Sequence, residues 1–220
     1  MRSAPAVRWR HAAPAQARSR ETTERFARAA EELLRTGPFE DISIQDIVRR
    51  ADRPIGSFYA RFRTKDALLP FLYQRYHEGM EELVSSRLAR VPWATLDLRQ
   101  AVEQLVDLQI AIFTERPWLI RAMALFARTS PQALPGDLVE RRRMVYEPIV
   151  QIFMRHRTRI MHSDPENAIR FGLFMMGAVA REKLLFVDAP HSRITPMAHG
   201  ALRDELVRML WSYLTCRGPR

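Results

Sequence analysis

The sequence predicts an all-α protein in which a small helical domain is followed by a larger helical bundle. Apolar residues recur at helical intervals from about residue 26 to residue 214. No segment shows the alternation of a half-buried strand, and the sequence contains neither a glycine-rich phosphate loop nor a fixed-period repeat. At 220 residues and 25.7 kDa the chain is long enough for both parts. We expect a disordered basic arm at residues 1–19, the small domain at 20–65 and the bundle at 66–216.

The N-terminal arm is strongly basic. Residues 1–20 contain five Arg and no acidic residue, in a chain whose net charge is +10. The bias toward Ala, Pro and Arg favours a disordered tail. Two alternatives stay open: the arm could follow the phosphates or minor groove of a DNA duplex, or it could be an organelle transit peptide.

The small domain begins with two helices. The first ends before Gly37, and its apolar face consists of Phe26, Ala29, Ala30, Leu33 and Leu34. The second opens at Ser43, whose side chain can cap the helix while Asp46 completes a capping box. Its inward stripe consists of Ile44, Ile47, Val48 and Ala51.

A tight turn joins the second helix to a third. Asp52 follows the apolar stripe, and Asp tolerates the left-handed backbone conformation better than most residues. Pro54 suits the first position of the third helix, where its missing N–H costs nothing. We expect about two turns of helix with Phe58 and Phe62 facing the core. The outward residues would then be Gly56, Ser57, Tyr59 and Arg61.

Two short helices with polar and cationic residues on the outer face are typical of a helix-turn-helix, whose second helix enters the major groove of DNA. The missing side chain of Gly56 would let a sugar-phosphate backbone come close. Downstream, Thr64 can cap the next helix. Lys65, beside the positive end of that helix, indicates an anion site.

The spacing of residues 51–69 resembles the DNA-binding signature of TetR-type transcriptional regulators. It reads Ala-x-x-x-x-Gly-Ser-Phe-Tyr-x-x-Phe-x-Thr-Lys-Asp-x-Leu-Leu from Ala51 to Leu69. The first helix closed by Gly37, and Phe39 and Ile42 before the second helix, extend the resemblance to about residues 20–69. The resemblance implies a DNA-binding regulator, a repressor that a small molecule releases from DNA.

Several residues depart from the usual pattern of that family. Asp52 stands where Gly is usual, and Arg53 replaces a small apolar residue. Pro54 replaces a Ser or Thr, which removes one phosphate donor, and Ile55 replaces a residue that is commonly polar or basic. The preference for particular bases therefore cannot be transferred. Arg61 stands where an aromatic residue or His is usual, and a guanidinium can bind phosphate at least as well.

We therefore assign hypothetical roles to the outward residues. Phosphates would be bound by Ser57, Tyr59, Arg61 and Lys65. Base edges or the groove wall would be contacted by Arg53, Pro54 and Ile55, together with Gln45 from the second helix.

The bundle is expected to begin with helices at about 65–88, from 98 to the Arg116-Pro117 break, at 118–128 and at 137–162. Pro70 should bend or loosen the first of these near its start. Asp164-Pro165-Glu166 begins a further helix, which is apolar on every side from Phe171 to Ala180 and so needs cover on every side. Thr195-Pro196 begins the last helix.

The resemblance implies that the last two helices pair with their copies across a twofold axis. Such a homodimer would recognise a palindromic operator in double-stranded DNA. The alternative is that both are ordinary core helices of a monomer.

The bundle is rich in Met and aromatic residues, which form adaptable apolar walls and suit a small hydrophobic effector. The same residues are what any helical core needs. Gln109 and Tyr146 lie among apolar neighbours, where they could orient a ligand by hydrogen bonding. The candidate ligand-binding residues are Gln109, Phe113, Trp118, Met123, Phe126, Tyr146, Phe153, Phe171, Phe174 and Met175.

Enzymatic classes find little support in the sequence. It contains no His-Glu-x-x-His, no Glu-x-x-His pair, no Cys-x-x-Cys and no Gly-x-Ser-x-Gly, so we expect no metal, cofactor or catalytic residue. Cys216 is the only cysteine, which favours the reducing cytoplasm. The longest apolar run is too short to span a membrane. The alternatives to a regulator are a helical ligand-binding protein or enzyme without sequence-specific DNA binding, and a nonspecific architectural DNA protein.

Overall fold

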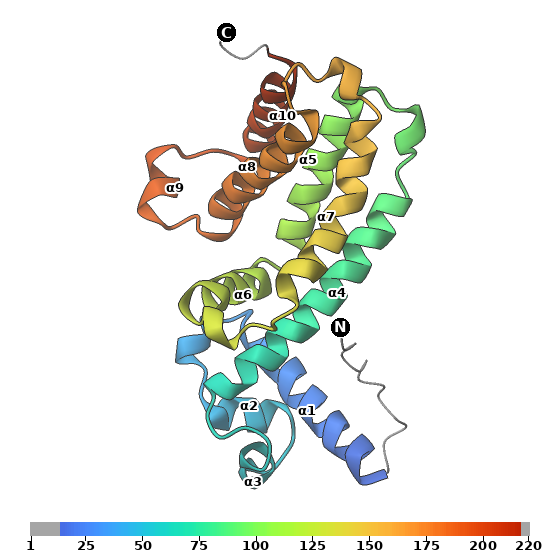
Figure 1. Ribbon diagram of the computed structural model, residues 1–220. Coiled ribbons are helices and arrows are strands. Elements are labelled where there is room, and N and C mark those ends of the chain that lie inside the picture. Colours follow the sequence, from blue (N-terminus) through green and yellow to red (C-terminus); the bar gives the residue numbers. More distant parts are fainter. Residues whose placement is uncertain (1–13, 217–220) are drawn as a thin grey trace. The chain divides into compact units, whose positions relative to one another are not determined.

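The computed structural model describes residues 14–216, and within this range it contains helices and no strand (Figure 1). The chain divides into two compact units, with the boundary between Leu72 and Tyr73. The predicted all-α class is confirmed. The boundary lies a few residues beyond the expected position at 65.

The first unit contains a long helix and two short ones. Its elements are α1 (Pro14–Leu33), the 3-10 turn η1 (Phe39–Asp41), α2 (Ile44–Arg50), α3 (Ile55–Tyr59), the 3-10 turn η2 (Asp66–Leu68) and the start of α4 (Leu69–Ala89). Because α1 begins at Pro14, residues 14–19, which we expected in the arm, are helical. The rest of the arm lies outside the described residues.

An aromatic cluster forms the centre of this unit. Phe58 from α3 is fully buried and meets Phe26 of α1 edge to face, with ring centroids 5.3 Å apart. Phe62 packs against Phe58 at the same centroid distance and is also buried, as its helical spacing predicted. Ile47 and Val48 of α2 are buried as well. Burial of these side chains holds α3 against α1 and α2.

The turn before α3 has the predicted left-handed residue but differs in detail. Asp52 has a φ of 51°. Pro54 is not the first helical residue: its ψ of 147° is extended, which makes it the N-cap, so α3 starts at Ile55. The helix has five residues, shorter than the expected two turns, because the chain leaves helical geometry after Ala60.

The second unit contains the rest of α4 and six further helices within the described residues. They are α5 (Leu98–Glu115), α6 (Pro117–Thr129), α7 (Leu138–Met154), α8 (Pro165–Leu185), α9 (Pro190–Ile194) and α10 (His199–Thr215). Short 3-10 turns lie at Trp93–Thr95, Pro131–Ala133 and Arg157–Arg159.

Three sequence-based helix boundaries were wrong. The segment expected as one helix from Lys65 is η2 followed by α4. Pro70 is the second residue of α4, a position where a backbone N–H would have no acceptor within the helix, so the proline costs no hydrogen bond there. The helix expected at 137–162 ends at Met154. The last helix begins at His199 instead of Thr195, and the short α9 precedes it.

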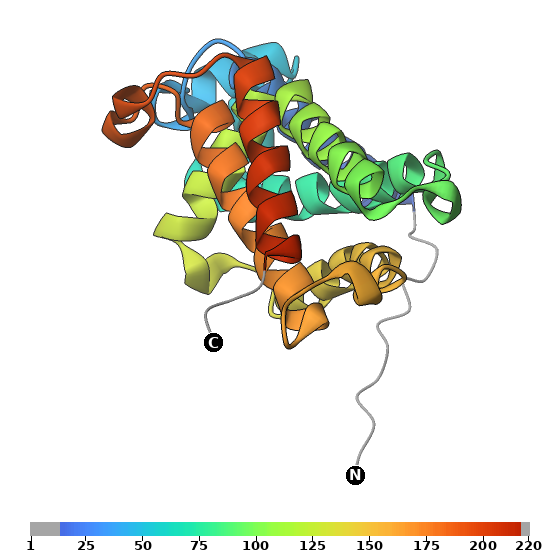
Figure 2. The same ribbon diagram turned by 90° about the horizontal axis from the view of Figure 1, so that it is seen from above.

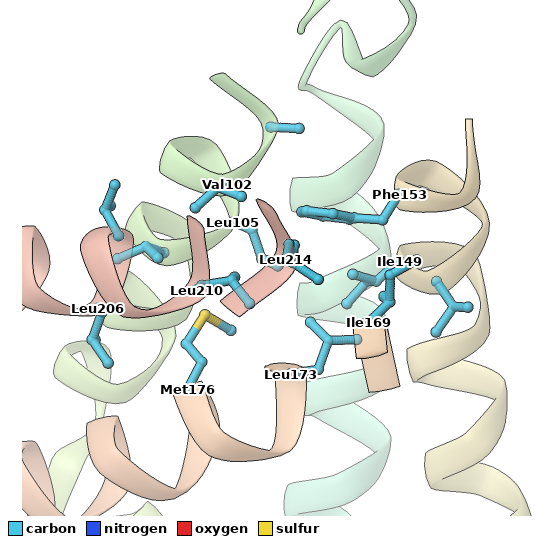
Figure 3. Close-up of a cluster of buried hydrophobic side chains, with 14 of the residues drawn as sticks. Val102, Leu105, Ile149, Phe153, Ile169, Leu173, Met176, Leu206, Leu210 and Leu214 are labelled. Atoms are coloured by element: carbon cyan, nitrogen blue, oxygen red, sulfur yellow. The ribbon is translucent and has the colours of Figure 1, made fainter. Parts of the chain in front are cut away.

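The core of the second unit lies where α5, α7, α8 and α10 meet. Helix α8 packs against α5, α7 and α10, and Figures 1 and 2 both show α8 (orange) beside α10 (red). Figure 3 shows the buried side chains that fill the space between these helices. They include Val102, Leu105, Ile149, Phe153, Ile169, Leu173, Met176, Leu206, Leu210 and Leu214.

Ion pairs at the edge of this core fix neighbouring helices. Arg203 of α10 binds both carboxylate oxygens of Asp107 in α5, at 2.7 and 3.0 Å. Arg141 of α7 binds Glu81 of α4 in the same bidentate way, at 3.0 and 3.2 Å. Such pairs fix the relative orientation of two side chains better than a single contact does.

Candidate functional site

The start of α2 is fixed by the predicted capping box. The Asp46 N–H donates to Ser43 Oγ at 3.1 Å, and the Ser43 N–H donates to Asp46 Oδ2 at 3.1 Å. Hydrogen bonds from Ser43 hold the pKa of the Asp46 carboxyl below its usual value, and the ion pair with Arg49 acts in the same direction. The capping box therefore sets where α2 begins. Because α2 has only seven residues, its start also sets where the turn to α3 lies.

The outer face of α3 presents two large side chains one turn apart. Ile55 is 45% exposed and Tyr59 is 53% exposed. Pro54 and Gly56 beside them are exposed too, and nothing lies within 4 Å of the place where a Cβ on Gly56 would stand. Gln45 is exposed on α2. Five of the nine candidate DNA-binding residues are thus open to solvent.

Arg53 and Arg61 make contacts within the first unit. The Arg53 guanidinium donates to the Asp52 carbonyl at 2.7 Å, so it folds back over the turn. Arg61 donates to the Ser57 carbonyl at 2.8 Å and to the Ser19 carbonyl of α1 at 3.3 Å. Arg61 and Ser57 are half-buried. Arg61 therefore ties the end of α3 to α1.

Lys65 is also half-buried, and its ammonium group binds backbone carbonyls. Its Nζ donates to the carbonyls of Phe39 and Glu40, at 2.8 Å each, and lies 4.9 Å from the centre of the Phe39 ring. Two of its three N–H donors are therefore used inside the unit. Thr64 Oγ1 accepts a hydrogen bond from the Ala67 N–H at 3.3 Å, as expected of a cap.

Sequence reasoning did not consider Arg63. It is exposed, and within residues 14–216 its side chain makes neither an ion pair nor a hydrogen bond. Its position four residues after Tyr59 was visible in the sequence. Only the structure separates it from Arg61, whose guanidinium is engaged.

The second unit contains a cavity of about 430 Å³. Its wall is formed by side chains of α4, α5, α6, α7 and α8, together with Leu134 from the loop before α7. Four of the ten candidate ligand-binding residues line it: Gln109, Phe113, Met123 and Tyr146.

The other six candidates are not part of the cavity lining. Phe126 and Phe153 are buried in the core, and Trp118 and Met175 are half-buried elsewhere. Phe171 and Phe174 are 46% and 64% exposed on α8. The Met-rich and aromatic composition could not show which of these residues line the cavity, because the core, the cavity wall and the outer surface contain the same types of side chain.

The cavity also has polar residues that sequence reasoning missed. Tyr73, Tyr76 and His77 line it from α4, and Arg128, Arg142 and Arg181 line it from three other helices. Arg142 Nη2 lies 3.4 Å from Tyr73 Oη and 3.4 Å from His77 Nε2. These residues are far apart in the sequence, so no local motif could have indicated that they meet.

Burial and positive charge shift two pKa values in this wall. Burial, together with the nearby charges of Arg142 and Arg141, lowers the pKa of His77 to about 4. Burial raises the pKa of Tyr76 to about 12, against the effect of Arg142. Both groups are therefore neutral at pH 7.

Comparison with known proteins identifies the first unit. The sequence pattern of the family described as bacterial regulatory proteins, tetR family, matches residues 27–70. This unit is a TetR-family domain. The match covers α2, the turn, α3 and η2, and thus every candidate DNA-binding residue.

The TetR-like architecture extends over nearly the whole chain. A protein from Mesorhizobium loti that is assigned to the TetR family of transcriptional regulators is 16% identical, with 90% of this chain and 96% of that chain covered and a TM-score of 0.62. A TetR-family regulator from Streptomyces coelicolor is 23% identical, with coverage of 89% and 97% and a TM-score of 0.51. The structure of superantigen PfiT matches as well, at 16% identity, coverage of 86% and 95% and a TM-score of 0.55. At these identities the likeness establishes the fold.

Other features bear on the rival classes. Among curated proteins, no sequence matches this chain. Within residues 14–216, no three His, Cys, Asp or Glu side chains gather in a way that could hold a metal ion. The helices of the same range include none that is both long and apolar enough to cross a bilayer.

Proposed function

We propose that this protein is a transcriptional repressor that binds a palindromic operator as a homodimer and leaves it when a small ligand enters the cavity of the second unit. The observation that carries the proposal is the outer face of α3. In this TetR-family domain, Ile55 and Tyr59 lie on the exposed face of α3, and the buried face of α3 holds the helix in place. Exposed apolar and aromatic side chains on a rigid short helix suit the floor and wall of a major groove.

The proposed roles follow from which side chains are available. Ile55, Pro54 and Gln45 contact base edges or the groove wall, where Ile55 can meet a thymine methyl group. Tyr59 and Arg63 contact phosphates, and Gly56 lets the sugar-phosphate backbone approach. The main role of four further candidates is to hold the turn and α3 in position: Arg53, Ser57, Arg61 and Lys65. Their hydrogen-bond donors that are not used within the unit also bind phosphate.

The proposed dimer uses α8 and α10. Phe171 and Phe174 of α8 lie on the outside of the second unit, with ring centroids 6.3 Å apart, and Phe171 also lies 5.7 Å from the Tyr213 ring of α10. Exposed aromatic residues such as those of α8, beside the half-buried Tyr213 of α10, are typical of a subunit interface. A twofold pair would present two copies of α3 to two half-sites.

Ligand release needs a differential effect on two states of the dimer. The ligand must favour the state that fits DNA poorly, by about 1–3 kcal/mol in a typical allosteric protein. Helix α4 starts in the TetR-family domain and continues into the second unit, where Tyr73, Tyr76 and His77 line the cavity. A ligand that moves these side chains therefore acts on a helix that is continuous with the DNA-binding unit.

Footprinting of the purified full-length protein on the DNA upstream of its own gene tests this function. We expect a protected palindrome whose half-sites are one or more helical turns apart, bound at least 1,000-fold more tightly than bulk DNA. Equal affinity for all sequences would instead support an architectural DNA protein. Absence of any DNA binding would contradict the proposal.

Two substitutions separate base reading from phosphate binding. Ile55→Gln should change the preferred base at one operator position, with a shift of about 1–3 kcal/mol in discrimination. Arg63→Gln should weaken binding to all DNA sequences alike and reduce the slope of log affinity against log salt by about 1. Arg35→Gln, outside the α2–α3 segment, is the control. If both variants gave the same profile over a set of single-base operator variants, the assigned roles would be wrong.

A further inference from the structure

The chemistry of the cavity wall indicates more about its ligand than size and hydrophobicity do. Most of the lining is apolar and comes from α4, α5, α6 and α7, with Met80, Leu105, Ile112, Phe113, Met123 and Ile149 among its members. The volume of about 430 Å³ lies within the usual range for small-molecule sites. An apolar ligand body would fit this wall.

Three arginines interrupt the apolar wall. Arg128, Arg142 and Arg181 come from α6, α7 and α8. Within the described part of the chain, none of the three forms an ion pair, although most other arginines of the second unit's helix surfaces do. Arg128 and Arg142 are exposed and Arg181 is half-buried, so two of the three charges are more open to solvent than the third.

Glu81 is the acidic residue of the cavity lining, and it does not neutralise these charges. Both of its carboxylate oxygens accept hydrogen bonds from Arg141, at 3.0 and 3.2 Å. Arg141 does not line the cavity. The three arginines therefore leave the cavity with a net positive charge.

The pKa shifts of the wall agree with a positive field. Burial and the charges of Arg128 and Arg142 lower the pKa of Arg181, and they outweigh the opposite effects of Tyr146 and Glu182. Arg142 and Arg141 lower the pKa of His77 beside the same cavity. A guanidinium stays protonated even so, which means that the repulsion among these groups persists until an anion enters.

We propose that the cavity binds an amphipathic anion, a molecule with an apolar body and one carboxylate, whose carboxylate is held by Arg181 together with the exposed Arg128 and Arg142. The inference deepens the proposed function and rests on it. Contacts with Tyr73 Oη and His77 Nε2, which belong to the same lining, hold the Arg142 guanidinium at the cavity wall. Guanidinium groups bind carboxylates through paired N–H donors, and the anion would relieve the repulsion among the three charges.

Calorimetric titration of the full-length protein with octanoate and with 1-octanol tests the charge preference, because the two probes share a carbon chain and differ in the anion. We expect octanoate to bind at least tenfold more tightly. Arg181→Met should bring the two affinities to within about threefold by weakening octanoate alone, since Met keeps the apolar stem and removes the charge. Equal affinities in the wild type, tighter binding of the alcohol or no binding of octanoate would overturn the inference.

The controls keep the test decisive. Arg121→Gln is the matched control, because Arg121 stacks on Phe186 as Arg128 does but does not line the cavity; both affinities should stay unchanged. If Arg181→Met fails to fold by circular dichroism, the exposed pair Arg128→Gln and Arg142→Gln replaces it, with the same expected loss of preference. Operator binding without ligand is measured separately. If operator binding fails, the proposed function falls; if it holds without a preference for octanoate, only the anion site falls.

Discussion

Asp52 determines how the chain enters the recognition helix. Among the described residues other than glycine, it alone has a positive φ, at 51°. An L-residue in this conformation costs about 1–2 kcal/mol, less for Asp and Asn, because its Cβ approaches the following carbonyl. The chain accepts this cost because the turn brings α3 into contact with α1 through Phe58.

We expect Asp52→Gly to be more stable than Asp52→Ala by about 1 kcal/mol, since both remove the carboxylate and only Gly lacks the steric penalty. Urea unfolding measures the difference. The order should reverse at Gly79, an exposed position inside α4 with open space around it, where Gly79→Ala should stabilise by about 0.5–1 kcal/mol. An Asp52→Ala protein as stable as Asp52→Gly would contradict this explanation of the turn.

His77 should make stability depend on pH. Its folded-state pKa of about 4 lies below the ordinary value of 6.5, so between these pH values the unfolded chain binds a proton that the folded protein does not bind. The stability that His77 contributes is present above pH 6.5 and is lost as the pH falls toward 4. Between pH 7 and pH 5 the loss should be about 2 kcal/mol.

Urea unfolding at pH 7 and pH 5 checks this dependence against His77→Gln, which keeps a polar side chain without a titrating ring. Carboxylates that also titrate cancel in the comparison. The wild type should lose more stability than the variant over this range. Equal losses would mean that His77 is protonated as easily in the folded protein as in the unfolded chain.

At the scale of the elements, the contact of α8 with α10 depends on a glycine. A Cβ on Gly172 would lie 2.6 Å from Leu210 Cδ1, and Leu210 is buried in the core. A Cβ on Gly177, one and a half turns further along α8, would meet nothing within 4 Å. The same substitution in one helix therefore has opposite consequences.

We expect Gly172→Ala to lower the free energy of unfolding by about 1–2 kcal/mol, because overpacking outweighs the gain in helix propensity. Gly177→Ala should leave it unchanged or raise it by up to about 1 kcal/mol. Thermal unfolding followed by circular dichroism compares the two. Stabilisation by both would show that Leu210 moves aside freely.

At the scale of the whole molecule, the proposed dimer should depend on the exposed aromatic residues of α8. Phe174→Arg places a charge in the proposed interface, where its desolvation would be costly. Size-exclusion chromatography with light scattering should then show a single chain of 25.7 kDa, and operator binding should weaken sharply. Ile194→Arg on α9, where the side chain is 74% exposed, is the control and should remain dimeric. A monomeric wild type would contradict the proposed interface.

The sequence by itself determined the features that arise within a few residues of one another. The capping box of Ser43 and Asp46, the left-handed Asp52, the inward Phe58 and Phe62 and the Asp164 cap are local, since each depends on backbone geometry or on one helical period. For the same reason the α2–turn–α3 segment and its family could be identified from residues 51–69.

Only the tertiary structure decided which charged groups are available and which residues meet in a cavity. The sequence predicts Lys65 and Arg61 as phosphate ligands, and only the structure shows that carbonyls of η1 and α1, 25 to 42 residues away, accept hydrogen bonds from them. The cavity unites side chains of five helices, and its three arginines lie on α6, α7 and α8. Such contacts depend on packing between distant segments, and helical periodicity specifies which face of a helix is buried but not which partner it meets.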